Sequence, residues 1–414
     1  MIKKKLNQLS PFDIFLLVSI SISTLFILAA IFTSKYFDAL VMDSSFLFSD
    51  YFYHIAGSSD TANMYSYGDP YSFPPFAYLM YSLLWNLTPY KDGESILNWK
   101  NFRDYDNALV VFVVYNLICV IFLIYCIGQY FQKNNAKYTL IFPIALVVSY
   151  PFMCTSIQRG NVCLLVAIML ALAWIWMDSE NKIKQEIALL LIAGAAGFKL
   201  YPAIFGLLFV KRKDWKKVLR LIVYGILAIF APFSIFGGID GLKNLIHTLT
   251  GFATYIDPDK KNTISGMAKW LGLKLNMAET VAENFGIGIN WIFFFTMIFF
   301  FFLGKKKWQE ILFLTAITVS FVASNWEYTS VYYLGVLLLF FKENDSTLGE
   351  NTWKRNIYLI GHSLAFGLIF SADFLMIHFR YGLVAGIFMT TYLIITINMG
   401  NVMMEAIPNI RRSI

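Results

Sequence analysis

Long apolar runs, separated by short polar turns, extend along almost the whole chain. Ten of these runs are long enough, or nearly long enough, to cross a lipid bilayer as a helix. They cover residues 12–32, 108–130, 138–155, 161–177, 217–237, 286–303, 309–324, 328–341, 357–376 and 381–402. Because a helix satisfies its own backbone hydrogen bonds in a membrane, the pattern predicts an all-α, polytopic membrane protein with one domain, residues 1–414.

Two further stretches have two interpretations, and both give about twelve membrane spans. Residues 73–90 are short and begin near two prolines, and residues 187–210 contain Lys199 near their middle. In the first interpretation, residues 73–90 cross the membrane and residues 187–210 form one helix. In the second, residues 73–90 stay at the membrane surface and residues 187–210 form a pair of short helices hinged at Lys199. A lysine in mid-span costs about 2.5–3.5 kcal/mol on insertion, which favours the hinged pair. The pair also places Asp50, Arg159 and Lys199 on one membrane face.

The composition agrees with a membrane protein, because 58% of the residues are hydrophobic and only 14% are charged. Soluble domains carry about a quarter charged residues. The formal charge of +7 comes from basic residues in short loops such as 211–217, which are topology signals on the cytoplasmic side. We therefore expect the lipid bilayer, and no nucleic acid, as a partner.

The N-terminal run 12–32 follows three lysines and is too long for the core of a signal peptide, which predicts a retained first span. The abundance of Phe, Lys and Asn is typical of a bacterium with an AT-rich genome. We therefore expect a multi-pass protein of the bacterial cytoplasmic membrane. Two long loops, 33–107 and 238–285, are expected on the outer face, with surface helices that cover a cavity.

The first long loop contains the leading candidate for a catalytic base, Asp50, with His54 four residues later on the same predicted helix face. A carboxylate near the membrane surface can take a proton from an attacking hydroxyl group. An aspartate in this position also suits the cap of a short helix in a solvated loop. The local pattern agrees with both interpretations.

Arg159 and Lys199 are the candidate ligands of a phosphate group. Arginine offers a planar fork to phosphate oxygens, and lysine acts as a point charge. Basic residues at helix ends often only extend toward the membrane surface. However, Gly160 and Pro202 are expected to break the helices beside these two residues. A side chain that only extends toward water needs no broken helix, so the breaks favour phosphate binding.

Further polar and aromatic residues near these breaks are candidate substrate contacts. Asn262 and Ser265 could bond sugar hydroxyls, and residues 326–328 could form an aromatic platform or belong to an interfacial belt. The full set of candidate substrate-binding residues is Tyr51, His54, Asn161, Tyr201, Asn262, Ser265, Trp326, Glu327 and Tyr328. The four cysteines lack metal-ligand spacing and are expected to be packing residues.

These segments resemble glycosyltransferase family 87, whose members are polyprenol-phosphate-mannose-dependent mannosyltransferases of the GT-C class. The resemblance rests mainly on the sequence QRGN at 158–161 and the sequence KLYP at 199–202. It is supported by a basic Trp-containing loop at 211–217, by Phe73-Pro74-Pro75, by Asn262 with Ser265-Gly266, and more loosely by 324–328.

The resemblance implies a GT-C fold and a catalytic aspartate in the first loop, at Asp50. It implies an inverting transfer of a hexose, with mannose expected, from a polyprenyl-phosphate donor to a lipid- or glycan-linked acceptor on the extracytoplasmic face. Related enzymes often carry a second acid two residues before the aspartate, where this chain has Phe48, so we expect no metal or other cofactor. Family members also often carry His where this chain has Tyr328.

Two other functions fit parts of the sequence. A transporter or flippase of lipid-linked sugars would also need broken membrane helices, but such proteins commonly show repeated halves, and the breaks here cluster in the first half. A structural subunit of an envelope-synthesis complex would use the charged residues for partner contacts and would lack an enclosed cavity.

Overall fold

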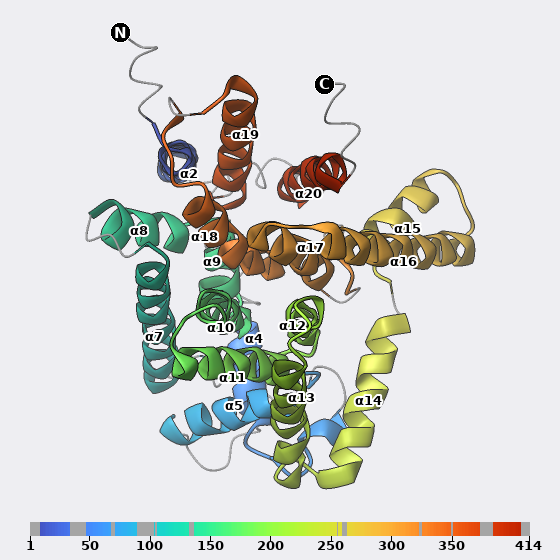
Figure 1. The fold of residues 1–414 in the computed structure, drawn as a ribbon. Coiled ribbons are helices and arrows are strands. Elements are labelled where there is room, and N and C mark those ends of the chain that lie inside the picture. Colours follow the sequence, from blue (N-terminus) through green and yellow to red (C-terminus); the bar gives the residue numbers. More distant parts are fainter. Residues whose placement is uncertain are drawn as a thin grey trace.

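The computed structural model describes residues 9–33, 47–67, 71–88, 103, 106–131, 136–254, 256–258, 263–322, 325–348, 351–372 and 384–406. Within these ranges the chain is helical, with α-helices, 3₁₀-helices and two π-helical turns, and no strand occurs. Figure 1 shows the helices as an open assembly around the central helix α10 (Cys163–Trp176). The all-α prediction is confirmed for the described residues.

Four helices are long and apolar enough to cross a membrane: α2 (Pro11–Thr33), α7 (Asp106–Phe131), α13 (Trp215–Phe230) with its 3₁₀ extension, and α16 (Glu279–Leu303). A fifth span is formed if the pair 137–147 and 150–156, bent by 62°, counts as one. The prediction of about twelve spans is therefore not confirmed within the described residues.

Two of the runs predicted as spans contain short helices in the protein core. Helices α17 (Lys307–Ser320) and α18 (Tyr333–Glu343) have 14 and 11 residues, and all thirteen residues of α17 from Trp308 to Ser320 are buried. Helix α10 is enclosed by α7, α11 (Lys182–Phe198) and α18. An apolar run can face lipid or protein equally well, so hydropathy alone does not give the number of spans in this chain.

The prediction of a hinge within 187–210 is confirmed. Helix α11 ends at Phe198, Lys199 has an extended backbone with φ −146°, and the chain resumes as η4 (Tyr201–Gly206) and α12 (Leu207–Lys211). Pro202 in the first turn of η4 cannot continue the preceding helix. Helix α5 (Pro75–Leu87), in the other ambiguous stretch, has only 13 residues. Its length of about 20 Å is less than the bilayer core.

The remaining elements connect these helices. They are α4 (Ser49–Gly57), η1 (Met64–Tyr67), η2 (Lys137–Ile141), α8 (Phe142–Val147), α9 (Tyr150–Met153), η3 (Cys154–Gln158), η5 (Ala231–Ser234), α14 (Gly238–Thr254), α15 (Ile264–Lys274), η6 (Glu327–Tyr332), α19 (Trp353–Ile369) and α20 (Val384–Ala406). The expected first long loop thus contains α4, η1 and α5, and the second contains α14 and α15.

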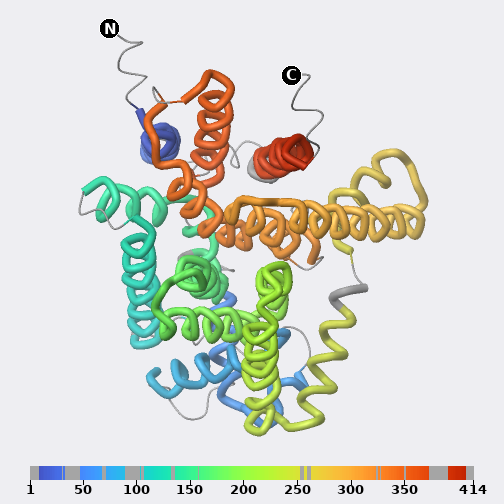
Figure 2. The backbone as a smooth tube through the Cα atoms, in the orientation of Figure 1, coloured from blue at the N-terminus to red at the C-terminus, as the bar shows by residue number. Residues whose placement is uncertain are grey.

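The chain path brings the first described helix, α2, beside α19, which lies near the end of the chain. Helix α2 packs against α19, and α19 packs against α20. Figure 2 shows these three segments, blue and red, on the same side of the assembly. A buried amide supports this end: Asn398 accepts hydrogen bonds from Gln309 and Tyr358, each at 3.0 Å. The other side of α10 holds α4 and α11, and there the candidate site is found.

Candidate active site

The first turn of α4 is docked onto the turn formed by residues 158–161. The backbone N–H of Phe48 donates to the carbonyl of Gln158 at 2.9 Å, and that of Asp50 donates to the carbonyl of Arg159 at 3.0 Å. The first N–H groups of a helix have no partner within the helix, so these carbonyls satisfy them. The backbone therefore brings Asp50 and Arg159 together across more than one hundred residues of sequence.

Gly160 makes this close approach possible. Its φ is +64°, and a Cβ atom at this position would lie 2.6 Å from the Cβ of Tyr51 and 2.9 Å from the ring of Phe112. A side chain here would have to adopt a left-handed backbone conformation and would also push α4 away from the turn. Glycine is thus required for the geometry around Asp50.

Replacing Gly160 by Ala is expected to lower the free energy of unfolding by about 2–4 kcal/mol, from left-handed strain and overpacking together. Thermal unfolding of the purified protein in detergent measures the loss. Gly238→Ala is the matched control, because Gly238 has φ +57° but no atom within 4 Å of the added Cβ. It should therefore show the smaller loss from backbone strain alone, and equal losses in the two variants would contradict this account.

The Asp50 carboxylate lies at the start of α4 with contacts on both oxygens. Asn161 Nδ2 donates to Oδ2 at 2.7 Å, Ser49 Oγ donates to Oδ1 at 3.3 Å, and Arg159 Nε lies 3.8 Å from Oδ1. The side chain of Asp50 is 18% exposed and that of Arg159 is 12% exposed. The expected proximity of Asp50 and Arg159 is confirmed, and the carboxylate keeps access from outside.

Lys199 is buried at the break between α11 and η4. Its Nζ lies 3.6 Å from the centre of the Phe73 ring and 6.0 Å from that of the Tyr328 ring. Within the described part of the chain, this ammonium forms no salt bridge and no hydrogen bond. A buried cation without such a partner is costly, which is typical of a site that receives an anion.

His54 lies behind this cation. Its ring is 4.0 Å from the Phe73 ring, centre to centre, and its Nδ1 shares a hydrogen bond of 3.1 Å with Tyr78 Oη. Burial, together with the nearby Lys199 ammonium, holds the pKa of His54 well below its ordinary value. The imidazole is therefore neutral and belongs to the wall of the site.

Residues 326–328, at the start of η6, lie on another side of the site around Asp50. The Arg159 guanidinium lies 5.2 Å from the ring centre of Trp326, a cation–π contact. The backbone carbonyl of Tyr328 accepts a hydrogen bond from Thr155 Oγ1 at 2.9 Å, which anchors η6 to η3. Trp326 and Tyr328 thus lie near Arg159 and Lys199, respectively. The Glu327 side chain and Asn262 lie outside the described residues.

The other expected contacts occupy different places. Tyr51 is fully buried against Phe112, and Tyr201 Oη shares a hydrogen bond of 3.1 Å with Tyr332 Oη and lies 3.6 Å from Cys163 Sγ. Both tyrosines form part of the inner wall. Tyr332, the last residue of η6, was not among the contacts predicted from the sequence.

Ser265 lies on α15, which packs against α16. Figure 1 shows this pair as an arm that extends away from α4. The structure thus separates Ser265 from the group around Asp50. Among the residues that were described, no group of three or more His, Cys, Asp or Glu side chains is arranged as metal ligands would be.

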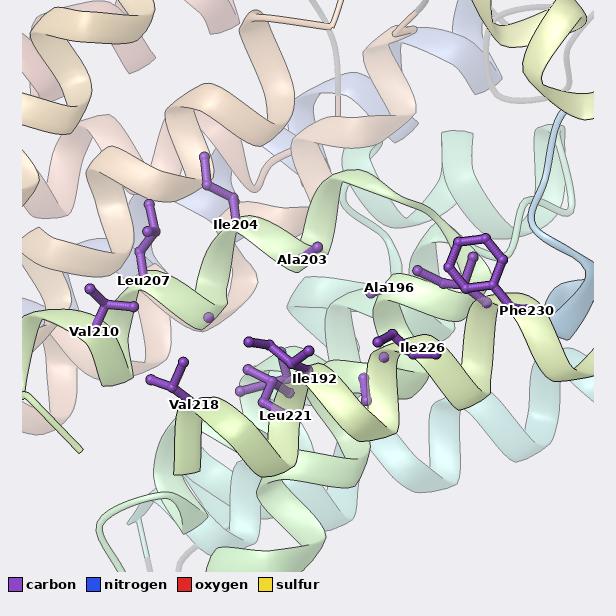
Figure 3. Close-up of a pocket in the computed structure, with 15 residues that line it drawn as sticks. Ile192, Ala196, Ala203, Ile204, Leu207, Val210, Val218, Leu221, Ile226 and Phe230 are labelled. Atoms are coloured by element: carbon purple, nitrogen blue, oxygen red, sulfur yellow. The ribbon is translucent and has the colours of Figure 1, made fainter. Parts of the chain in front are cut away.

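An apolar cavity of about 510 Å³ lies between α11, η4, α12 and α13. Figure 3 shows Ile192 and Ala196 of α11 on one side and Ala203 and Ile204 of η4 on another, with α13 facing them. Lys199 lies in the chain between Ala196 and Ala203, so the cavity adjoins the segment that carries the cation. All of its lining side chains are aliphatic, aromatic or glycine.

A model of glycosyltransferase family 87 matches residues 71–324, more than half of the 414-residue chain. The chain belongs to glycosyltransferase family 87. The resemblance described from short motifs is thereby confirmed, and this protein is a glycosyltransferase with membrane helices. Comparison with curated proteins and with solved structures gives no match.

The family match covers one part of the site of this glycosyltransferase. Arg159, Asn161 and Lys199 lie inside the matched range, whereas Asp50 precedes it and Tyr328 follows it. The hydrogen bonds from α4 and η6 to the segment 154–161 unite these parts. The family match therefore includes Arg159 and Asn161, the residues that contact the Asp50 carboxylate.

Proposed function

We propose that this family 87 glycosyltransferase moves a hexose from a polyprenyl-phosphate donor to an acceptor hydroxyl group, with Asp50 as general base. The observation that carries the proposal is the Asp50 carboxylate beside Arg159, together with the buried Lys199 ammonium, which forms no salt bridge or hydrogen bond with any described residue. A base and cations in one site suit the transfer of a sugar away from a phosphate.

The proposed reaction is a single displacement. The acceptor oxygen attacks the anomeric carbon, a new carbon–oxygen bond forms, and the bond from that carbon to the phosphate oxygen breaks. Asp50 takes the acceptor proton, and polyprenyl phosphate leaves with the bonding electron pair. One displacement inverts the configuration at the anomeric carbon. Lys199 and Arg159 stabilise the charge that develops on the leaving phosphate.

The apolar cavity supports a lipid-linked donor in preference to a nucleotide sugar. Its lining has no polar side chain, and the helix that forms one wall, α13, has no buried residue. An isoprenoid chain could therefore lie against α13 from the bilayer while its phosphate reaches Lys199. A nucleotide would leave its base and ribose without hydrogen-bond partners in such a cavity.

Four finer points belong to the same proposal. The hexose is mannose, the acceptor is lipid- or glycan-linked, the reaction needs no metal, and the site faces outward from a bacterial cytoplasmic membrane. They rest on the family resemblance and on the sequence patterns described above. The outward face agrees with the basic loop 211–217 placed on the cytoplasmic side.

The test is transfer of radiolabelled sugar to lipid extract of the native membrane by the purified protein in detergent. Polyprenyl-phosphate mannose, polyprenyl-phosphate glucose and a nucleotide-linked mannose are compared, with and without a chelator. Label transfer from a polyprenyl donor in chelator supports the proposal. Transfer from the nucleotide donor alone would refute the lipid-linked donor, and dependence on added metal would refute the metal-free reaction.

Narrowing the cavity is expected to weaken binding of long-chain donors. Gly225 lines the cavity on α13, and no atom lies within 4 Å of a Cβ added there, so Gly225→Phe should fill space without disturbing the fold. We expect KM for a long polyprenyl donor to rise about tenfold, which corresponds to about 1.4 kcal/mol. A donor with a short chain should be affected much less.

Gly288→Phe is the matched control for this variant. Gly288 is an exposed glycine on the apolar helix α16, also with no atom within 4 Å of an added Cβ, and it does not line the cavity. The control should leave KM unchanged for both donors. An equal change for short and long chains in Gly225→Phe would show that the cavity does not hold the chain.

A further inference from the structure

We infer that Asn161 is a positioning residue that holds one oxygen of Asp50 and leaves the other to accept the proton. The inference rests on the proposed role of Asp50 as a base. It assigns to Asn161 a role toward the carboxylate in place of the substrate contact expected from the sequence.

The orientation of the Asn161 amide follows from its two contacts. Its Oδ1 accepts a hydrogen bond from the backbone N–H of Cys163 at 3.0 Å, at the start of α10. Its Nδ2 therefore faces Asp50 and donates to Oδ2 at 2.7 Å. The reversed amide would place two acceptors against each other and two donors against each other, so both contacts select the same orientation.

Asn161 is also out of reach for a substrate. Only 2% of its surface is exposed, because it lies beneath α4 at the start of the central helix. Helix α10 is enclosed by its neighbours, so the amide is attached to a rigid element. A donor fixed in this way holds the carboxylate in one rotamer.

The two oxygens of Asp50 therefore differ. Oδ2 accepts the short bond from Asn161, whereas Oδ1 has longer contacts, 3.3 Å to Ser49 Oγ and 3.8 Å to Arg159 Nε. The less engaged oxygen, Oδ1, is the one that can turn a lone pair toward an acceptor hydroxyl.

Two variants distinguish the hydrogen bond of Asn161 to Asp50 from its hydrogen bond to the backbone at the start of α10. Asn161→Ser can still accept from the Cys163 N–H, because serine is a good helix cap, but it is too short to reach Asp50. Asn161→Asp keeps both the size and the capping oxygen, and it replaces the donor with a second carboxylate. Both variants are expected to retain the unfolding temperature of the natural protein to within a few degrees.

The first readout is the pH dependence of kcat/KM for sugar transfer. Loss of the donor disfavours the ionised carboxylate, so the acidic limb should move to higher pH in Asn161→Ser. The limb should move further, by about one pH unit or more, in Asn161→Asp, because two adjacent carboxylates share the charge. An unchanged limb in both folded variants would overturn the inference, since a purely structural role would lower activity without moving it.

The second readout needs no activity. A water-soluble carbodiimide with glycine ethyl ester modifies protonated carboxyl groups, and mass spectrometry measures the labelled fraction of the peptide with Asp50 at each pH. The midpoint for Asp50 should rise in Asn161→Ser. If the labelling midpoint of Asp50 rises in Asn161→Ser but the natural protein transfers no sugar, the positioning role is supported and the proposed function is refuted. An unchanged midpoint would overturn the positioning role even if transfer is observed.

Discussion

Asp50→Asn should lower sugar transfer by about 10²–10⁴-fold, the usual contribution of a general base. Asparagine has the same shape and can still accept from Asn161 Nδ2, so α4 should remain docked on the turn. However, an amide oxygen cannot take the proton of an acceptor hydroxyl. The measurement is the initial rate of label transfer at saturating donor, with thermal unfolding as a check on the fold.

Asp60→Asn is the matched control for this variant. Asp60 lies in the same stretch of chain, is solvent-exposed and accepts a hydrogen bond from Tyr67 Oη at 2.7 Å, which asparagine can also accept. The control should transfer sugar at the rate of the natural protein. If Asp50→Asn and Asp50→Ala both retain that rate, Asp50 is not the base.

Lys199→Met is expected to lower kcat/KM for the donor by about 10²–10³-fold, the usual loss when one group that stabilises a developing negative charge is removed. Lys199→Arg should retain part of the rate, because a cation remains near the phosphate. Methionine fills a similar volume against the Phe73 ring. Kinetics with a polyprenyl-phosphate donor measure both effects.

The same variant is expected to raise the temperature of unfolding. The Lys199 ammonium is buried and forms no salt bridge with any described residue, so its charge costs free energy in the folded protein. Removing the charge should therefore stabilise the fold while activity is lost, as occurs when a site is strained for function. Lys243→Met, at an exposed lysine paired with Asp240, is the control and should change neither property. Lower stability in Lys199→Met would show that the lysine serves the fold.

The features that could be predicted from the sequence depend on neighbouring residues. Pro202 after Lys199 indicated the break between α11 and η4, and the structure has it there. Glycine beside Arg159 indicated a break in the helix, and Gly160 has a positive φ there. The sequences at 158–161 and 199–202 also indicated the family, which the match over 71–324 confirms.

The number of spans could not be predicted in the same way. Hydropathy measures only the preference of a segment to leave water, and a protein core satisfies that preference as well as lipid does. Helices α17 and α18 lie in two of the runs predicted as spans, but they are short and surrounded by other helices. Their length in three dimensions, set by the breaks at their ends, separates them from the long helices α7 and α16.

The amino-acid sequence was sufficient for the helical class, the hinge at Lys199 and the family, because these follow from local residue chemistry. Tertiary structure was needed for the contacts of Asp50 with Arg159 and Asn161, the place of Cys163 and Tyr332 in the wall, and the separation of Ser265 from the site. Each of these depends on which side chains meet after distant helices pack. The orientation of the Asn161 amide and the contact of the Cys163 thiol with Tyr201 cannot be predicted from a pattern along the chain.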